Sequence, residues 1–423
     1  MAVSQTKWSV EAWFMLDATL VFAVIAAILI IGFVGDLFFK KTGIPFFIFL
    51  IAMGIVLGPI LNVFPREPLL PALAIFAELT LLMVLFYGGL DTKFGAALRG
   101  GSRAFIQVSI YVLASTTIIG LLVNFLLGWD ILQSFIFASM VGGETTAAVV
   151  IPLSRSLNFK EITVAFLTLE TAMNTIFSIV LFFTFLGAYT TGVSNWLSAV
   201  ATIAEDFGVG IVIGALLGSV WVYILHFLQK QKFTYVLTLG LIFITYALST
   251  RLGGNGELSV IIFGIILGNY YLLRRITKHR MSMDALQKQL GAFQEEISFL
   301  METLFFVFLG LTFVIDPAVI ISDLTTAVAI VAVLLGVRYV ATSISTFRSE
   351  MRSERQGIIL MCAQGLVPAT LVIIALNLQL PLANDFLSIV TYVIILTNIV
   401  TAAGAILGRH RQRTSRSSTE WTI

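Results

Sequence analysis

The fold is decided by residues 131–154, which read ILQSFIFASMVGGETTAAVVIPLS. The stretch is apolar, and about 20 such residues cross the hydrocarbon core of a membrane as a helix. Its centre carries Gly142, Gly143, Glu144, Thr145 and Thr146. Two adjacent glycines weaken a helix, and a break within a membrane is tolerated only where protein or a cavity covers the backbone. The segment therefore predicts an interrupted membrane helix inside a larger bundle.

The composition of the whole chain predicts the same environment. Hydrophobic residues make up 58% of the 423 residues, charged residues 11%, and the mean hydropathy is +1.00, whereas soluble domains carry about 25% charged residues. These values exclude a soluble enzyme and a disordered protein. A net charge of +2 without a basic domain excludes a nucleic-acid-binding protein. Cys362 is the single cysteine and the three histidines are scattered, so no disulfide, zinc site or cofactor is expected.

We expect an all-α polytopic membrane protein with thirteen spans in a single membrane domain over residues 1–423. The expected spans are residues 15–39, 44–62, 69–91, 103–127, 131–154, 161–187, 196–229, 232–250, 256–273, 293–316, 321–347, 355–378 and 384–408. With this count, all but four of the 25 Lys and Arg residues fall in loops or the tail on one side. The positive-inside rule then places the protein in the cell membrane with its N-terminus outside and the tail, 409–423, in the cytoplasm.

A second interruption lies in the twelfth span, where residues 364–368 read QGLVP. The fifth and twelfth spans are equivalent if two inverted six-helix repeats are joined by a linking helix over 196–229. Matched interruptions in two repeats are typical of the binding site of a secondary transporter, whereas ordinary glycine packing or a proline kink is the alternative for each break alone. We therefore predict that helices five and twelve are interrupted, with breaks at Gly142, Gly143, Thr146, Gly365 and Pro368.

Five ionisable residues lie deep in the expected spans, where each costs about 2.5–3.5 kcal/mol. They are Glu78, Glu144, Glu170, Glu302 and Arg338. At the first break, Glu144 and the hydroxyl groups of Thr145 and Thr146 offer oxygen ligands for a monovalent cation or a proton. The alternative is that Glu144 accepts hydrogen bonds from backbone donors exposed at the break.

Glu170 and Arg338 are expected to form a structural ion pair, because Arg338 is the one basic residue inside an expected span. Glu302 could compete for Arg338, or be a protonated, hydrogen-bonded residue at a helix interface. Glu78 is expected to be structural. Asn174 lies four residues after Glu170 and therefore on the same helix face.

Several motifs resemble those of the cation–proton antiporter superfamily, and within it the NhaP-type and NapA-like sodium/proton antiporters. Residues 145–149 (TTAAV) align with that family's TDPAAV in the unwound fifth helix, and residues 170–175 (ETAMNT) with its ESxxND. Arg338 matches the basic residue of a core helix. Further similar segments are 54–59 (GIVLGP), Glu78 with 85–91 (LFYGGLD), 305–311 (FFVFLGL) and 364–369 (QGLVPA).

The resemblance implies a homodimer built from two parts. A dimerisation part would comprise residues 15–91 and 232–316, and a mobile transport core residues 103–187 and 321–408. The resemblance also implies that the unwound helices five and twelve cross within the core. The two aspartates of the family's motifs are Thr145 and Thr175 in this chain. Asn174, Glu170 and Arg338 are thus carried over by position, and Glu144 is the neighbouring carboxylate.

From these residues we expect exchange of a monovalent cation, sodium or potassium, for protons by alternating access. A cation at Glu144, with Thr145, Asn174 and Thr175 as neutral oxygen ligands, would compete with a proton for one carboxylate, so exchange would be electroneutral. Glu78 and Glu302 are possible secondary sites, and membrane lipid surrounds the protein. The alternatives are a cation-coupled transporter of another solute with the same fold, and a non-transporting member that senses pH or binds a partner. No constellation typical of an enzyme is visible in the spans.

Overall fold

The computed structural model describes residues 18–64, 66–91, 94–191, 196–228, 231, 233–271, 284–315 and 317–420, and within them all regular structure is helical. The elements are α2 (Ala18–Thr42), α3 (Phe47–Ile55), the π-helical η1 (Val56–Ile60), α4 (Arg66–Asp91), α5 (Phe94–Leu127), α6 (Ile131–Val141), α7 (Ala147–Ser156), α8 (Glu161–Thr191), α9 (Trp196–Leu228), α10 (Thr234–Arg251), α11 (Gly256–Gly268), α13 (Asp284–Leu311), α14 (Ile320–Ser345), the 3-10 turn η2 (Glu350–Glu354), α15 (Arg355–Leu360), α16 (Leu366–Asn377) and α17 (Ala383–Glu420). The all-helical fold class is confirmed.

Each of the thirteen expected spans has a helical counterpart in the described residues. Six stretches are long and apolar enough to cross a membrane unaided: Gly101–Leu127, Glu161–Thr190, Glu205–Leu225, Thr234–Arg251, Ile320–Ser345 and Ala383–Leu407. The other apolar helices are shorter, and the expected spans 131–154 and 355–378 are each divided into two helices. Residues 15–17, 229, 232, 272–273 and 316 of the expected spans, and 421–423 of the tail, lie outside the described residues.

Three helices extend well beyond their expected spans. Helix α5 begins at Phe94, before the expected residue 103, and α13 begins at Asp284, before the expected residue 293. Helix α17 continues to Glu420 through most of the expected tail. Residues 409–420 contain no glycine or proline that would end a helix. The apolar pattern therefore marks where α17 leaves the membrane, but not where the helix ends.

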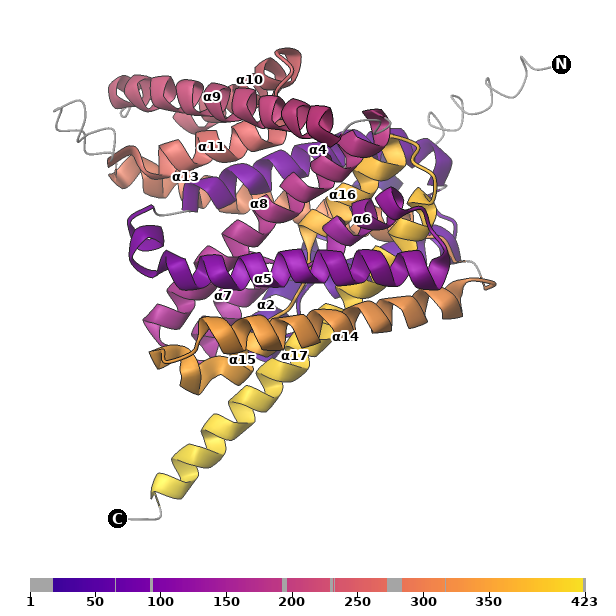
Figure 1. The fold of residues 1–423 in the computed structure, drawn as a ribbon, viewed down its shortest axis with the longest axis vertical. Coiled ribbons are helices and arrows are strands. Elements are labelled where there is room, and N and C mark those ends of the chain that lie inside the picture. The colour runs from indigo at the N-terminus through magenta and orange to yellow at the C-terminus, as the bar shows by residue number, and fades with distance from the viewer. Residues whose placement is uncertain are drawn as a thin grey trace.

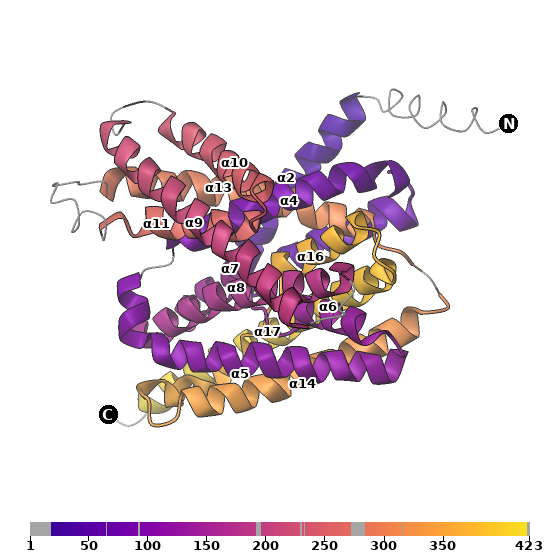
Figure 2. The ribbon, with the colours of Figure 1, turned by 45° about the horizontal axis from the view of Figure 1, so that its top comes forward.

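The helices fall into two groups in space. Helices α9, α10 and α11 lie together on one side of the molecule, and α5 and α14 lie side by side on the other (Figures 1 and 2). In the first group α3 packs on α13 and α4 packs on α11, while in the second α5 packs on α8 and α14 on α17. The α3–α13 and α4–α11 pairs each join the two repeats and are equivalent to one another, and the α5–α8 pair of the first repeat is equivalent to α14–α17 of the second, as expected for inverted repeats.

Glycines bring the equivalent helix pairs into close contact. A Cβ atom on Gly54 of α3 would collide with the backbone of α13 at Val307 and Gly310, and one on Gly310 would collide with α3. Gly89 of α4 and Gly264 of α11 face each other in the same way. Small residues let helix backbones approach closely in membranes, so two matching glycine crossings hold α3 to α13 and α4 to α11.

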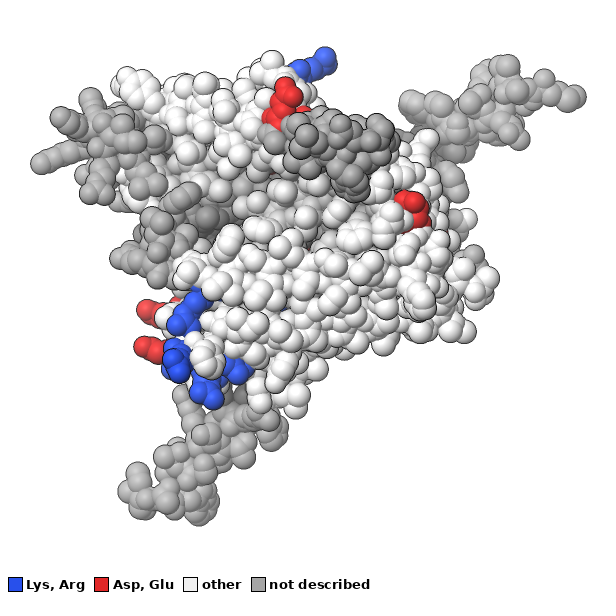
Figure 3. All heavy atoms as spheres, viewed as in Figure 1, with Lys and Arg blue, Asp and Glu red and all other residues white. Residues whose placement is uncertain are grey.

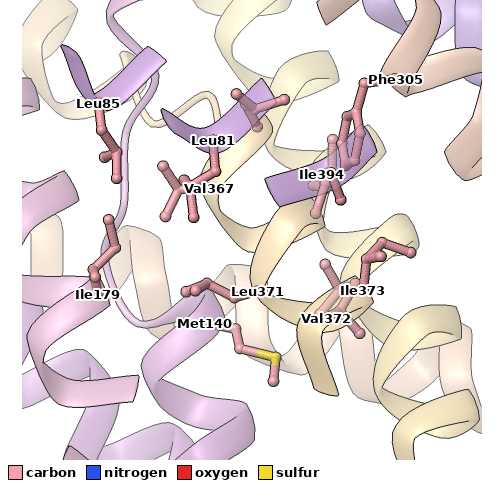
Figure 4. Packing of buried hydrophobic residues seen from close by; sticks show 14 of the residues in the cluster. Leu81, Leu85, Met140, Ile179, Phe305, Val367, Leu371, Val372, Ile373 and Ile394 are labelled. Carbon is pink, nitrogen blue, oxygen red and sulfur yellow. The ribbon is translucent and has the colours of Figure 1, made fainter. Parts of the chain in front are cut away.

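An apolar cluster joins the two groups of helices around the first turns of α16. Leu81 of α4 lies beside Val367 of α16, and Leu371 of α16 lies near Met140 of α6 (Figure 4). All four side chains are buried. The contact between the groups therefore depends on apolar packing at the place where α16 begins.

Candidate functional site

The first break separates α6 from α7 at residues 142–146. Gly143 adopts a φ of +101°, which is favourable for glycine but not for residues with a Cβ atom. The side chain of Glu144 is 2% exposed and that of Thr145 is 0% exposed. The double glycine therefore turns the chain and places a carboxylate in the protein interior.

The second break comprises residues 361–365, between α15 and α16, and all five are buried. It lies earlier in the chain than the expected 364–368. Pro368 belongs to the first turn of α16, where its missing N–H has no helical partner to lose. Gly365 is the N-cap residue of α16, so it does lie at the break as expected.

The two breaks cross and satisfy each other's backbone groups. The N–H of Thr146 donates to the carbonyl oxygen of Ala363 at 2.8 Å, and Nε2 of Gln364 donates to the carbonyl oxygen of Val141 at 2.6 Å. Buried backbone groups must find such partners, and in lipid no water supplies them. Each break is therefore stable only beside the other.

Glu144 connects the breaks through its carboxylate. Its Oε2 accepts a hydrogen bond of 3.3 Å from the N–H of Gly365, which is its one hydrogen-bond partner among the described residues. A negative charge is favourable at this position because the N-terminus of α16 carries a partial positive charge. Glu144 is also the one acidic residue in the two breaks. The geometry is thus compatible with both a backbone-capping role and a cation- or proton-binding role.

The structure brings Asn174 to the first break. Its Nδ2 donates to Oγ1 of Thr145 at 3.0 Å, and both side chains are fully buried. Thr175, the next residue of α8, is only half-buried. Within the described part of the chain, neither Asn174 nor Thr175 makes a direct hydrogen bond to Glu144. Three of the four expected ion-site residues, Glu144, Thr145 and Asn174, therefore surround the crossing, with Thr175 at its edge.

Glu170 and Arg338 form the expected ion pair. Nη1 of Arg338 lies 2.6 Å from Oε1 of Glu170, and Nη2 lies 3.4 Å from Oε2, with both side chains fully buried. Nε of Arg338 donates to the carbonyl oxygen of Ile358 at 3.1 Å, and its guanidinium lies 4.9 Å from the ring centre of Tyr111. The pair therefore ties α8 of one repeat to α14 and α15 of the other.

Gln107 is part of this network and is not among the residues expected from the sequence. Its Nε2 lies 3.1 Å from Oγ1 of Thr342 and 3.5 Å from Oε1 of Glu170, and its Oε1 accepts a hydrogen bond from Ser345. A glutamine near the start of an otherwise apolar span is the signal that could have identified it.

The remaining acidic candidates lie away from this ion pair. Glu302 of α13 and Glu78 of α4 are half-buried. The ion pair of Arg338 is with Glu170, so the alternative in which Glu302 competes for Arg338 does not occur. Glu257 in the first turn of α11 is 8% exposed and close enough to Glu78 for their charges to interact. Asn255 caps the N-terminus of α11, and an acidic residue in the first turn after such a cap is favourable at a helix N-terminus. This pattern in the sequence could have indicated Glu257.

Comparison with known proteins gives a consistent picture. Residues 23–407 match the family described as "Sodium/hydrogen exchanger, transmembrane". The chain is 26% identical over 304 residues to the Na(+)/H(+) antiporter NhaP of Pseudomonas aeruginosa, covering 68% of this chain and 69% of that protein. It is 26% identical over 376 residues to the K(+)/H(+) antiporter NhaP2 of Shewanella baltica, covering 86% of this chain but only 62% of that protein.

Among solved structures, the fold is similar to that of the sodium proton antiporter MjNhaP1 from Methanocaldococcus jannaschii at pH 8. The TM-score is 0.77 at 20% identity, and the match covers 92% of this chain and 97% of the other. At this identity the similarity shows the fold alone. The family resemblance of the sequence motifs and the antiporter fold are both confirmed.

Proposed function

Because the chain belongs to the sodium/hydrogen exchanger family, we propose that it exchanges a monovalent cation, sodium or potassium, for protons across the cell membrane. The observation that carries this proposal is the crossing of two broken helices around one buried carboxylate, Glu144. The family is one of transporters, and relatives named for sodium and for potassium support either ion.

Glu144 couples the two ions because one carboxylate cannot hold both. A cation binds the ionised carboxylate, and a proton removes that charge. Thr145, Asn174 and Thr175 add neutral oxygens, so the occupied site carries one monovalent ion and is neutral overall in either case. Exchange of one cation for one proton is therefore electroneutral.

Alternating access follows if the transport core, 103–187 and 321–408, moves against the dimerisation part, 15–91 and 232–316. Two observations support this division. The cluster at Leu81 and Val367 is apolar (Figure 4), and apolar surfaces can slide without leaving charges unpaired. Each of the two ion pairs that the structure describes, Lys40 with Asp36 and Arg338 with Glu170, lies within a single part. The core therefore moves as one body, and residues 196–229 join the two repeats.

The charge distribution supports the proposed orientation. Basic side chains gather at one end of the molecule, while the lateral surface is nearly free of charge (Figure 3). Arg155, Lys160, Arg348 and Arg352 are exposed and lie in the loops proposed to face the cytoplasm. The C-terminus is then cytoplasmic, the N-terminus is outside, and the apolar lateral surface contacts lipid. The homodimer forms through the dimerisation part.

Proton flux in proteoliposomes tests the proposal. An imposed gradient of lithium, sodium, potassium or rubidium is applied, and the internal pH is followed with a fluorescent dye. Glu144→Gln should abolish exchange while the protein stays folded, because the amide keeps the shape but cannot be ionised. Glu144→Asp should retain part of the exchange, and Glu350→Gln, at an exposed acid, should retain all of it.

The result can also support a different role. Full exchange in Glu144→Gln would show that the coupling carboxylate lies elsewhere. Folded wild-type protein without exchange of any alkali ion would instead favour a non-transporting role. The bond from Gly365 to Glu144 is compatible with that outcome, because a carboxylate that only caps α16 needs no cation. Exchange that requires an added organic solute would favour a coupled transporter of that solute.

A further inference from the structure

Two buried amide side chains at the second break have oxygens that lack a hydrogen-bond donor. Nε2 of Gln364 donates to the carbonyl oxygen of Val141 at 2.6 Å, and Nδ2 of Asn398 donates to the carbonyl oxygens of Gln364 and Ile394 at 2.6 and 2.7 Å. Both side chains are fully buried. Within the described residues, no donor reaches Oε1 of Gln364 or Oδ1 of Asn398.

The orientation of these two amides is fixed by their partners. A carbonyl oxygen can only accept, so the NH₂ group of each amide must face it. Exchanging the oxygen and nitrogen of either amide would place two acceptors against each other. The oxygens of Gln364 and Asn398 are therefore turned away from Val141 and Ile394.

The first repeat contains an equivalent asparagine. Asn174 lies on α8, which follows the first break, and Asn398 lies on α17, which follows the second. Each asparagine donates to a residue of its own break, Thr145 or Gln364, and in each the amide oxygen is buried without a donor among the described residues. The crossing is thus flanked by one such asparagine from each repeat.

All three amide oxygens belong to side chains near the carboxylate of Glu144. Gln364 precedes Gly365, whose N–H is bonded to Glu144, and Asn398 is bonded to Gln364. Asn174 is bonded to Thr145, the neighbour of Glu144. Native proteins leave few buried polar atoms unsatisfied. Three unsatisfied amide oxygens are thus connected to one carboxylate through hydrogen bonds and neighbouring residues. A positively charged occupant would satisfy them, because carbonyl-type oxygens can replace the hydration shell of an alkali cation.

We propose that Gln364 and Asn398 are ligands of the transported cation, with Asn398 the equivalent of Asn174 in the second repeat. The inference rests on the proposed exchange and adds the second break to the binding site. The site then combines one carboxylate with three amide oxygens. Since only one ligand is charged, the amide oxygens determine which alkali ion fits.

The test compares Asn398→Ala with Asn124→Ala. Asn124 also donates its amide to a backbone oxygen, that of Trp129, but lies at the far end of α5. For each variant, the KM for lithium, sodium, potassium and rubidium is measured from proton flux, and the rise in melting temperature with each ion is measured on the purified protein. Asn398→Ala should raise the KM for the preferred ion at least tenfold and change the ratio of KM values among the ions. Asn124→Ala should leave the ratio unchanged.

A merely structural role for Asn398 would lower the amount of folded protein or the maximal rate equally for all ions. Unchanged KM ratios and unchanged ion-dependent melting in folded Asn398→Ala would overturn the proposal. Buried water, and not the cation, would then be the partner of these amide oxygens. If the alanine variant does not fold, Asn398→Asp provides the same test, because a charge at a ligand position must change the KM ratios. Wild-type protein without exchange would refute the proposed function, whereas wild-type exchange with unchanged ratios in the variants would refute only this inference.

Discussion

Arg338→Ala removes the cation that faces Glu170 in the buried ion pair of the core. The carboxylate would keep only the hydrogen bond from Gln107, which is long at 3.5 Å. The carbonyl oxygen of Ile358 would lose the N–H of Arg338 that it accepts at 3.1 Å. The N–H of Met361 still donates to that oxygen at 3.3 Å, so the variant leaves a buried charge without its partner and removes one further hydrogen bond.

The cost can be estimated from these two losses. Removing one partner of a buried ion pair costs about 3–5 kcal/mol, and the lost hydrogen bond to Ile358 adds about 1 kcal/mol. We expect Arg338→Ala to lower the free energy of unfolding by about 4–6 kcal/mol. Replacing Glu170 by Ala as well removes the buried charge, so the double variant should recover about 2–3 kcal/mol.

Chemical unfolding in detergent micelles measures these free energies for the wild type, the two single variants and the double variant. Arg355→Ala is the matched control, because Arg355 bonds only to Oγ1 of Thr346 and the carbonyl oxygen of Ser343 in the described residues. It should cost about 1 kcal/mol and add independently to Glu170→Ala. Additive effects of Arg338→Ala and Glu170→Ala would refute the energetic coupling of the pair.

Three further predictions follow from the topology, the helix crossings and the altered motifs. A cysteine introduced at Ser417 should react with an impermeant reagent only from the cytoplasmic side, and labelling only from outside would contradict the proposed orientation. Gly54→Val should destabilise the protein by about 1–3 kcal/mol in thermal unfolding because its side chain would meet the backbone of α13, whereas Gly336→Ala, where nothing lies within 4 Å, should cost nothing measurable. Thr145→Asp with Thr175→Asp should add negative charge to the site and make exchange electrogenic, measured as a membrane potential that depends on the cation gradient; flux without any potential would contradict this.

Charge balance and periodicity are sufficient to predict much of this structure. Arg338 is the one basic residue deep within the expected spans, so a buried Glu is its expected partner, and the family motif favours Glu170 while leaving Glu302 as an alternative. The double glycine at 142–143 weakens a helix because glycine loses the most backbone freedom on ordering, so the first break is also predictable. The ends of the helices are less predictable. The apolar part of α17 ends near residue 408, but no glycine or proline there ends the helix, which continues to Glu420.

The polar network at the crossing is not predictable in the same way. Gln364 and Asn398 carry no charge that must be balanced, and their partners are backbone carbonyls whose positions depend on how the two breaks cross. Pro368 illustrates the same limit, since a proline predicts that a helix is interrupted nearby but not whether it lies in the break or in the first turn after it.

The crossing also has a consequence for how the protein is made. Glu144 and its partner Gly365 are 221 residues apart in the chain, and at about 5–20 residues per second the second emerges from the ribosome roughly 10–45 s after the first. During that interval the N–H of Thr146 also lacks the carbonyl of Ala363, and unsatisfied backbone groups in lipid are costly. The first repeat is therefore inserted into the membrane before its break has these hydrogen-bond partners. Insertion of the second repeat supplies them and completes the folding of both repeats. Truncation after α9 should leave a chain that the cell degrades.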